Sequence, residues 1–376
     1  MFKIQKGSIL IYRVFDIGDE IDLEQVKPKL ALFIKNNWAI NQGPKQSIII
    51  KNPPLSLRLN DETIKINGNE VDVNIFVKIW DYGVCSVCLN LDASSSSFDD
   101  LVNLTSFLDK DTTVDIFARN KVELIFNQIK DVIKKPRIWS VFEDYTLILA
   151  ESIVKSSVSN TDQPLVEEKV TNPRDLLTSQ LAHILIGEKK EELSESMEKD
   201  ILSTVLQYSK KDMTVIDWNS AFVFEPSGTF DIPDLIEFVL THQLEIRYYN
   251  ELLEEKKKIL YNNSGKSHLL NVNDLFSNMS VQASQRFLEF SDMIRKVDNS
   301  IETVGDFYLA KVIESANHRF NYKIRKVLND NMEELQQQSE SFSNKVQTKQ
   351  SNFLSLLITI LIVIELILPF INRMFK

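Results

Sequence analysis

Glycine is scarce in this sequence, with only 9 glycines among 376 residues. Phosphate-cradling loops and repeated tight hairpins need several glycines, because glycine alone adopts the left-handed backbone without steric cost. The segment Ser264-Gly265-Lys266-Ser267 resembles the end of a phosphate-binding loop, but Leu260 stands where the leading glycine is required. A helical pattern also precedes it instead of a strand. We therefore interpret this segment as a turn between helices.

Cysteine and histidine are also rare. The two cysteines, Cys85 and Cys88, are too few for a disulfide scaffold, and this favours a reducing compartment. They lie in a strand pattern, where residues three apart point to opposite faces, so we interpret them as packed small residues rather than a zinc or redox pair. The four histidines are far apart in the sequence. No catalytic motif, metal site or cofactor site is predicted.

Positive charge is in deficit, because the formal net charge is −10. Nucleic-acid binding draws much of its affinity from neutralised phosphates, so DNA is not an expected partner. One local exception is a basic cluster on a predicted helix: Arg319, Lys323, Arg325 and Lys326. It is either a solvated helix face or a contact for a polyanion such as ribosomal RNA. Anionic lipid is the weaker choice, since the cluster precedes the apolar C-terminal segment by about 40 Å of straight helix.

The longest apolar run is residues 353–370, FLSLLITILIVIELILPF. As a helix it would be roughly 27 Å long, which is enough to cross the hydrocarbon core of a bilayer. We predict a transmembrane anchor, with a buried helix of a folded domain as the alternative. Its polar members are Ser355, Thr359 and Glu365. Glu365 is interpreted either as a carboxylate tolerated near the interface or as a contact between spans of an oligomer.

The N-terminal segment lacks the apolar core of a secretion signal. About 350 residues precede the predicted span, so we expect a single-pass membrane protein whose N-terminal head faces the cytoplasm or an organelle matrix. The positive-inside rule does not decide the orientation, because Lys345 and Lys349 before the span are balanced by Arg373 and Lys376 after it.

Residues 1–228 alternate strand and helix patterns and predict an α+β head with a mixed or antiparallel sheet and packed helices. Two strands are expected at 71–80 and 82–91, and a long amphipathic helix at 113–135. The polar stretch 156–173 is interpreted as a linker or exposed loop, and 214–224 as a strand.

Residues 229–350 predict a helical hairpin or coiled-coil stalk, which is followed by the span at 353–370 and a short tail at 371–376. The helical pattern begins after Pro233. An interrupted heptad-like seam follows, either within one subunit or between subunits. Its members are Phe287, Phe290, Ile294, Val297, Ile301, Leu328, Leu335 and Phe342.

Several short motifs suggest a family resemblance. They are Tyr82-Gly83-Val84, Asp306-Phe307-Tyr308, the charged helix from Arg325 to Lys349, and the apolar run from Leu356 to Leu366 with its late Glu365. In these features the chain resembles the RMD/RMND (required for meiotic nuclear division) family. It departs from the family at Ser351–Leu354, where acidic residues and tryptophan are usual. The resemblance implies a membrane-tethered oligomer without known catalysis, whose mitochondrial relatives are inner-membrane proteins linked to support of translation.

The expected function is a non-catalytic, membrane-anchored scaffold that self-associates and presents its head to another protein or to the ribosome, with membrane lipid as a further partner. Two alternatives stay open. One is a channel or transporter subunit. The other is an enzyme whose site leaves no linear motif and would gather Asp81, Tyr82 and other titratable groups in a pocket.

Overall fold

The computed structural model describes residues 1–34, 39–40, 52–157, 166–189, 193–264 and 307–320, with isolated helical residues between 326 and 359. The chain divides into two compact units. The first comprises Met1–Ile246 and Lys296–Tyr322, and the second comprises Arg247–Arg295 and Lys323–Lys376. All clusters and surfaces considered below lie in the first unit.

The first unit is built on a large mixed sheet of 11 strands, ordered β11-β12-β13-β9-β1-β7-β6-β4-β3, with β10 added to β9 and β5 to β6. All of its strand pairs are antiparallel except the parallel pair β9 and β13. A separate ladder joins β2 to β8. The strand bounds are β1 Phe2–Asp16, β2 Glu20–Ile21, β3 Ala39–Ile40, β4 Leu55–Arg58, β5 Glu62–Ile66, β6 Asn69–Ile79, β7 Val84–Asp92, β8 Ile133–Lys134, β9 Phe142–Ser157, β10 Val166–Lys169, β11 Val205–Leu206, β12 Met213–Ile216 and β13 Ser220–Phe224.

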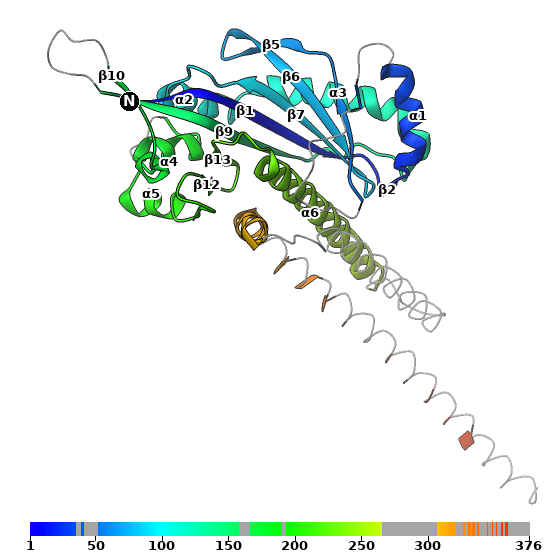
Figure 1. Cartoon of the computed structure of the whole chain (residues 1–376). Helices are drawn as coiled ribbons and strands as arrows, with labels where there is room; N and C mark the ends of the chain where they lie inside the picture. The colour runs from blue at the N-terminus through cyan, green and yellow to red at the C-terminus, as the bar shows by residue number, and fades with distance from the viewer. Residues whose placement is uncertain are drawn as a thin grey trace, which may run out of the picture. The chain divides into compact units, whose positions relative to one another are not determined.

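Helices cover both faces of this sheet. Figure 1 shows α2 and α3 along one side of the sheet and the start of α6 along the other. The bounds are α1 Leu23–Ile34, α2 Phe98–Leu108, α3 Thr113–Ile129, η1 Lys130–Val132, η2 Pro173–Leu176, α4 Ser179–Ile186, α5 Glu195–Ile201 and α6 Asp231–Ser264. A further helical stretch covers residues 307–320.

The central strands are apolar on both faces, which explains the two helical layers. Side chains of a strand alternate between faces, so a strand that is apolar at nearly every position must be buried on both sides. In β1, Ile9 and Ile11 belong to the core shared with α2 and α3, whereas Leu10 and Val14 belong to the core shared with α6. The two cysteines of β7 follow the same rule, because Cys85 lies in the first core and Cys88 in the second.

The fold-class prediction of a head, a helical stalk and a membrane span is wrong. Helix α6 begins near the predicted position, but Ile232, Leu235, Ile236, Phe238 and Val239 are all buried in the core of the first unit. A free-standing stalk helix would keep a polar outer face. Residues 307–320 were also assigned to the stalk, and they too pack on this core through Leu309, Val312, Ile313, Ala316 and Phe320. The apolar side chains of both described helical stretches therefore pack on the core of the sheet.

The predicted transmembrane helix is also corrected. Within the described part of the chain, no helix combines the length and the apolar character that crossing a bilayer requires. Most of 353–370, including Glu365, lies outside the described residues, as do the predicted seam residues from Phe287 to Phe342. Ser355 and Thr359 are described and exposed, and the Thr359 hydroxyl donates a hydrogen bond to the Ser355 carbonyl over 2.8 Å.

Two local expectations are also corrected. Residues 214–224 form two strands, β12 and β13, which pair antiparallel around a turn at Asp217–Asn219. The turn is fixed by the Tyr145 hydroxyl, which donates to the carbonyls of Asp217 and Ser220 at 3.0 and 2.6 Å. The expected linker at 156–173 contains β10, a short edge strand on β9. Its exposed Glu167 and Glu168 gave it a loop-like composition, although charged residues are common on edge strands.

The turn between β6 and β7 supplies a stability test. Gly83 has φ +99°, and a Cβ atom there would lie 1.8 Å from the carbonyl oxygen of Gly18. Gly68 has φ +78°, and a Cβ atom there would meet nothing within 4 Å. We expect Gly83→Ala to lower the free energy of unfolding by about 3 kcal/mol or more, and Gly68→Ala by only about 1–2 kcal/mol from backbone strain. Urea unfolding of both variants measures the difference, and equal losses would contradict the close approach.

Candidate functional site

A buried ionic cluster joins the sheet to α6. The Lys78 ammonium, on β6, lies 2.8 Å from Asp234 Oδ1 and 2.6 Å from Glu237 Oε2, both on α6. The other carboxylate oxygen of Glu237 accepts a hydrogen bond from the Ser86 hydroxyl on β7. Ser86 and Glu237 are almost fully buried. Two consecutive strands and a helix that is distant in sequence are thus held together by one set of charge-assisted hydrogen bonds.

A second polar contact lies further along α6. The Thr241 hydroxyl donates to the Phe238 carbonyl at 2.6 Å, so the Tyr82 hydroxyl, 2.6 Å away, must be the donor to Thr241. His242 Nδ1 is 2.7 Å from the same carbonyl, which indicates that this nitrogen carries the proton. The rings of Trp80, Phe238 and His242 surround these groups. Thr241 and His242 are buried, so their polar atoms are satisfied within the core.

Lys78, Cys85, Cys88 and Tyr12 have pKa values above their ordinary values. Burial alone would lower the pKa of Lys78, but Glu237 and Asp234 outweigh it and raise that pKa above its ordinary value. Burial raises the pKa of the Cys85 thiol to about 12, and it also raises the pKa values of Cys88 and Tyr12. At neutral pH these groups are a fixed cation, two thiols and a phenol. Catalysis needs a group poised near the working pH, and these are not.

A small cavity lies on the opposite face of the sheet. It is lined by Arg13, Thr105, Leu108, Asp109, Asp144, Thr146, Leu185, Gly187, Asn219 and Ser220, and encloses about 20 Å³. That volume holds about one water molecule, whereas small-molecule sites are typically about 300–1,000 Å³. The guanidinium of Arg13 is already engaged, with Nε 2.6 Å from Asp115 and Nη1 2.9 Å from the Tyr12 carbonyl. The cavity suits a structural water and is too small for a substrate.

A charged cluster closes the end of β1. Arg137 Nη2 lies 2.8 Å from Asp16 Oδ2, Arg137 Nη1 contacts Asp19, and the Lys135 ammonium is 2.8 Å from Asp19. Burial raises the pKa of Asp16 to about 6, although Arg137 works to lower it. Burial would also raise the pKa of Asp19, but hydrogen bonds from Lys135 and Arg137 lower it overall. The Asp16 carboxyl therefore titrates near pH 6. Both of its oxygens already accept hydrogen bonds, one from Arg137 and the other from the Gly18 amide.

An exposed surface combines aromatic rings with lysines. It consists of Tyr208, Lys210 and Lys211 from the β11–β12 loop, and Phe307, Tyr308 and Lys311 from the helix 307–320. We call it the aromatic–lysine surface. Tyr208 and Phe307 are 72% and 77% exposed. The rings of Tyr208 and Tyr308 are 5.5 Å apart, and the Lys311 ammonium lies 4.6 Å from the Phe307 ring centre.

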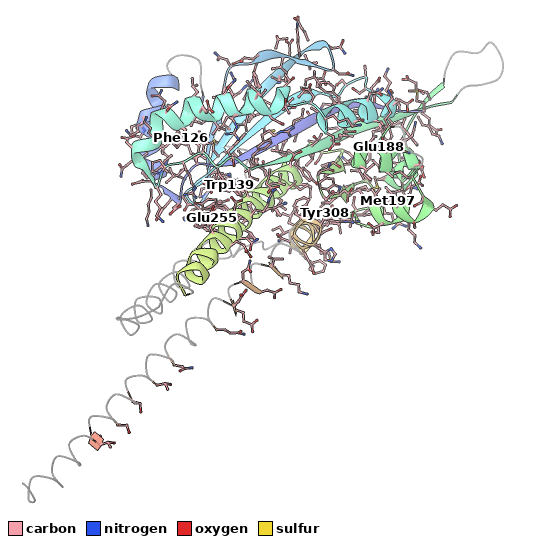
Figure 2. The ribbon with its side chains drawn as sticks, turned by 180° about the vertical axis from the view of Figure 1, so that it is seen from behind. Phe126, Trp139, Glu188, Met197, Glu255 and Tyr308 are labelled. Carbon is pink, nitrogen blue, oxygen red and sulfur yellow. The ribbon has the colours of Figure 1, made fainter. Side chains whose placement is uncertain are left out.

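The aromatic–lysine surface is held by the core beneath it. The Tyr308 hydroxyl lies 3.3 Å from that of Thr214 on β12, and Figure 2 labels Tyr308 on its helix. The loop is fixed by Asp212, whose carboxylate accepts from the amides of Tyr208 and Ser209 at 2.7 and 2.8 Å. Exposed aromatic residues on an ordered support are typical of binding surfaces, where Tyr and Phe supply contact area at low entropic cost.

The predicted polyanion contact is only partly described. Arg319 lies in the first unit, where its guanidinium is 3.2 Å from Asp200 and 3.9 Å from Asp217. Lys326 is exposed, whereas Lys323 and Arg325 lie outside the described residues. Arg319 thus ties its helix to the α5 region. The polyanion contact stays a prediction.

The other sequence candidates are not brought together in a site. The Asp81 carboxylate accepts from Asn52 at 2.7 Å, and Tyr82 is directed to Thr241, so neither lines the cavity. Among the described residues, no group of three or more His, Cys, Asp and Glu side chains is placed to hold a metal. The sequence patterns did not predict the buried ionic cluster of Lys78, Asp234 and Glu237. Its available signals were a lysine within the alternating strand β6 and the acidic pair Asp234 and Glu237, three apart within an apolar helical run.

The fold and these clusters define a class of protein: a mixed sheet with a helical layer on each face, a buried ionic cluster between the sheet and α6, and an exposed aromatic surface. Residues 6–231 match the family described as "Uncharacterized protein MJ0711, N-terminal domain". Because the match covers more than half of the chain, the protein belongs to this family. No solved structure matches it.

One relative is the uncharacterized protein MJ0711 of Methanocaldococcus jannaschii. The two are 25% identical over 134 residues, which are 35% of this chain and 37% of the relative. The chain therefore spans little more than a third of the length of that relative.

The family match corrects the RMD/RMND resemblance. The motifs behind that resemblance were short, and Tyr82-Gly83 proves to be part of the tight turn between β6 and β7, which many antiparallel strand pairs could share. The membrane-anchored scaffold and the single-pass localisation are likewise not upheld, because no described helix could span a bilayer.

The buried ionic cluster predicts a large cost for removing one partner. We expect Lys78→Met to lower the free energy of unfolding by about 3 kcal/mol, since Glu237 and Asp234 lose their counter-charge in the core. Adding Glu237→Leu should cost less than the sum of the single changes. The control is Lys27→Met, which breaks an exposed pair with Glu24 and should change stability by about 0.5 kcal/mol or less. Similar urea midpoints for the Lys78 and Lys27 variants would contradict the prediction.

Asp16 predicts a specific pH dependence of stability. Its pKa is about 6 in the folded protein against 3.8 for an ordinary Asp, so the folded state binds the extra proton between these values. The contribution of Asp16 to the free energy of unfolding therefore falls as pH rises from 3.8 to about 6, by at most about 3 kcal/mol, and is flat above. Asp19 has the opposite sign, because its lowered pKa makes its contribution fall only as pH drops below 3.8.

The variant Asp16→Asn removes this titration. Urea unfolding from pH 4 to 7 should show that the decline between pH 4 and 6 is smaller in the variant than in the natural protein. Parallel curves for the two proteins would show that Asp16 does not titrate in this range.

Proposed function

We propose that this protein is a non-catalytic binding protein that presents the aromatic–lysine surface to a partner protein. The observation that carries the proposal is the exposure of Tyr208 and Phe307, at 72% and 77%, on elements fixed to the sheet core. Burying such rings against a partner gains about 25 cal/mol for each Å² of apolar area, and aromatic residues dominate binding energies at protein interfaces.

The buried charged groups and the small cavity also support a binding protein without catalytic activity. Lys78 is held as a cation by two carboxylates, and the Asp16 carboxylate is held by Arg137. The cavity beside Arg13 has room for about one water molecule. These groups stabilise the fold, and none of them is arranged around a space that a substrate could enter. Binding through an ordered surface needs only such a rigid interior.

Site-specific photo-cross-linking tests the proposal. A benzophenone-bearing amino acid replaces Tyr208 in the full-length chain, in cells that make the protein. The matched control carries it at Leu124, which is 47% exposed on α3, across the sheet from α6. We expect a discrete adduct from position 208 and not from position 124. Phe307→Ala should reduce the adduct about fivefold or more, which corresponds to at least 1 kcal/mol.

The adduct is then identified by mass spectrometry. A defined protein, including a second copy of this chain, would support the proposal. It would be overturned by the same adducts from both positions, or by none from position 208 although the protein is folded and abundant.

A further inference from the structure

We infer that the partner segment received by the aromatic–lysine surface is an acidic peptide that also carries apolar or aromatic side chains. This inference rests on the proposed function and adds the chemistry of the partner. It is argued from the charges at the surface, from the rings beside them and from the charge of the whole chain.

Positive charge is concentrated at this surface. Lys210, Lys211 and Lys311 are exposed, and within the described part of the chain none of the three forms an ion pair. The nearest exposed carboxylate along the helix belongs to Glu314, one turn after Lys311, and it bounds the positive area on that side. Asp212 lies in the same loop, but it is buried and its carboxylate is occupied by loop amides. The surface therefore offers ammonium groups whose charge is available to a partner.

The whole chain makes this positive area selective. The formal net charge is −10, so an acidic partner is repelled by the protein at long range and is attracted only where lysines gather. At about 0.1 M salt the Debye length is roughly 10 Å, so each lysine attracts acidic groups only over about that distance. Correct docking of an acidic peptide is thereby favoured over docking elsewhere.

The rings supply the apolar part of the recognition. Tyr208 and Tyr308 meet at a tilt of 55°, so together they offer an angled corner instead of a flat stack. The Lys311 ammonium lies 4.6 Å from the centre of the Phe307 ring, which is exposed. A carboxylate that approaches Lys311 therefore also comes close to this ring. Apolar and acidic side chains that alternate along a peptide can therefore engage rings and lysines together.

A single-stranded nucleic acid is the less favoured occupant. Its binding needs a positive groove that follows many phosphates and rings that stack on successive bases. The aromatic–lysine surface has only three lysines, and the net charge of the whole chain is −10. The rings of Tyr208 and Tyr308 are tilted by 55° to each other, so they do not form parallel platforms for successive bases. A nucleic acid is therefore included as an outcome of the experiment.

Fluorescence anisotropy with the full-length protein provides the test. Four labelled probes of equal length are compared: a 12-residue peptide that repeats Glu-Leu-Glu-Phe, the same peptide with Gln for Glu, the same with Lys for Glu, and a uridylate 12-mer. We expect the acidic peptide to bind about tenfold more tightly than the Gln peptide at low salt. Added salt should reduce the difference.

Two sets of variants locate the binding. Lys210→Glu with Lys211→Glu should weaken the acidic peptide about tenfold and leave the Gln peptide nearly unchanged. Tyr208→Ala with Phe307→Ala should weaken both peptides. The matched control is Lys65→Glu with Lys110→Glu, which changes the net charge equally at exposed positions elsewhere and should have little effect. Unchanged thermal midpoints confirm that the variants are folded.

The inference is overturned if the Gln peptide binds as tightly as the acidic one, if the control pair weakens binding as much as the loop pair, or if the uridylate binds more tightly than the acidic peptide. Its failure can be told apart from failure of the proposed function. A specific adduct from position 208 without acidic preference refutes the acidic partner alone. Absence of that adduct refutes the binding protein itself.

Discussion

The ion pairs of Lys78 with Asp234 and Glu237 are the contact on which the arrangement of the first unit depends. A buried ammonium without a partner is costly, so α6 must lie where its two carboxylates meet β6. Ser86 of β7 satisfies the remaining oxygen of Glu237, and this fixes the helix across two neighbouring strands. Apolar side chains of α6 then fill the surrounding space. The helix 307–320 completes the layer, with Phe320 against Tyr145 at 5.1 Å and Arg319 against Asp200.

The charged groups of the interior differ from those of the surface in whether they have partners. Inside, every charge named above has a partner, and the thiols and phenols stay neutral because burial raises their pKa values. Outside, the helix 307–320 and the β11–β12 loop leave aromatic rings and lysines in solvent, although the elements that carry them are anchored. A preformed surface of this kind loses little conformational entropy on binding. This supports a binding role in a chain whose family match supplies no activity.

The sequence predicted those elements whose pattern is local. The alternation at 71–80 and 82–91 corresponds to β6 and β7, and the helix expected at 113–135 is α3 with a shorter C-terminal end. The opposite placement of Cys85 and Cys88 also followed from strand periodicity.

Packing between segments that are distant in sequence could not be predicted from local patterns. The polar residues Asp234, Glu237 and Thr241 share one face of α6, yet that face is turned to the sheet and not to solvent. The apolar residues of the helix do not say whether they face a sheet, another helix or lipid. The parallel pairing of β9 with β13 joins segments about 70 residues apart, with no signal in either strand. The aromatic–lysine surface likewise brings together a loop and a helix that are separated by about 100 residues. The local sequence around Lys78 does not indicate its ion pairs, because Asp234 and Glu237 lie far along the chain.

The central claim is that α6 is locked onto the sheet and does not open independently of it. Native-state hydrogen exchange of the amides of residues 235–246, compared with those of residues 8–15 in β1, measures this most directly. The account predicts that both sets exchange only through global unfolding, with the same free energy of opening. Exchange of the α6 amides through a local opening, at a free energy several kcal/mol below that of β1, would contradict it.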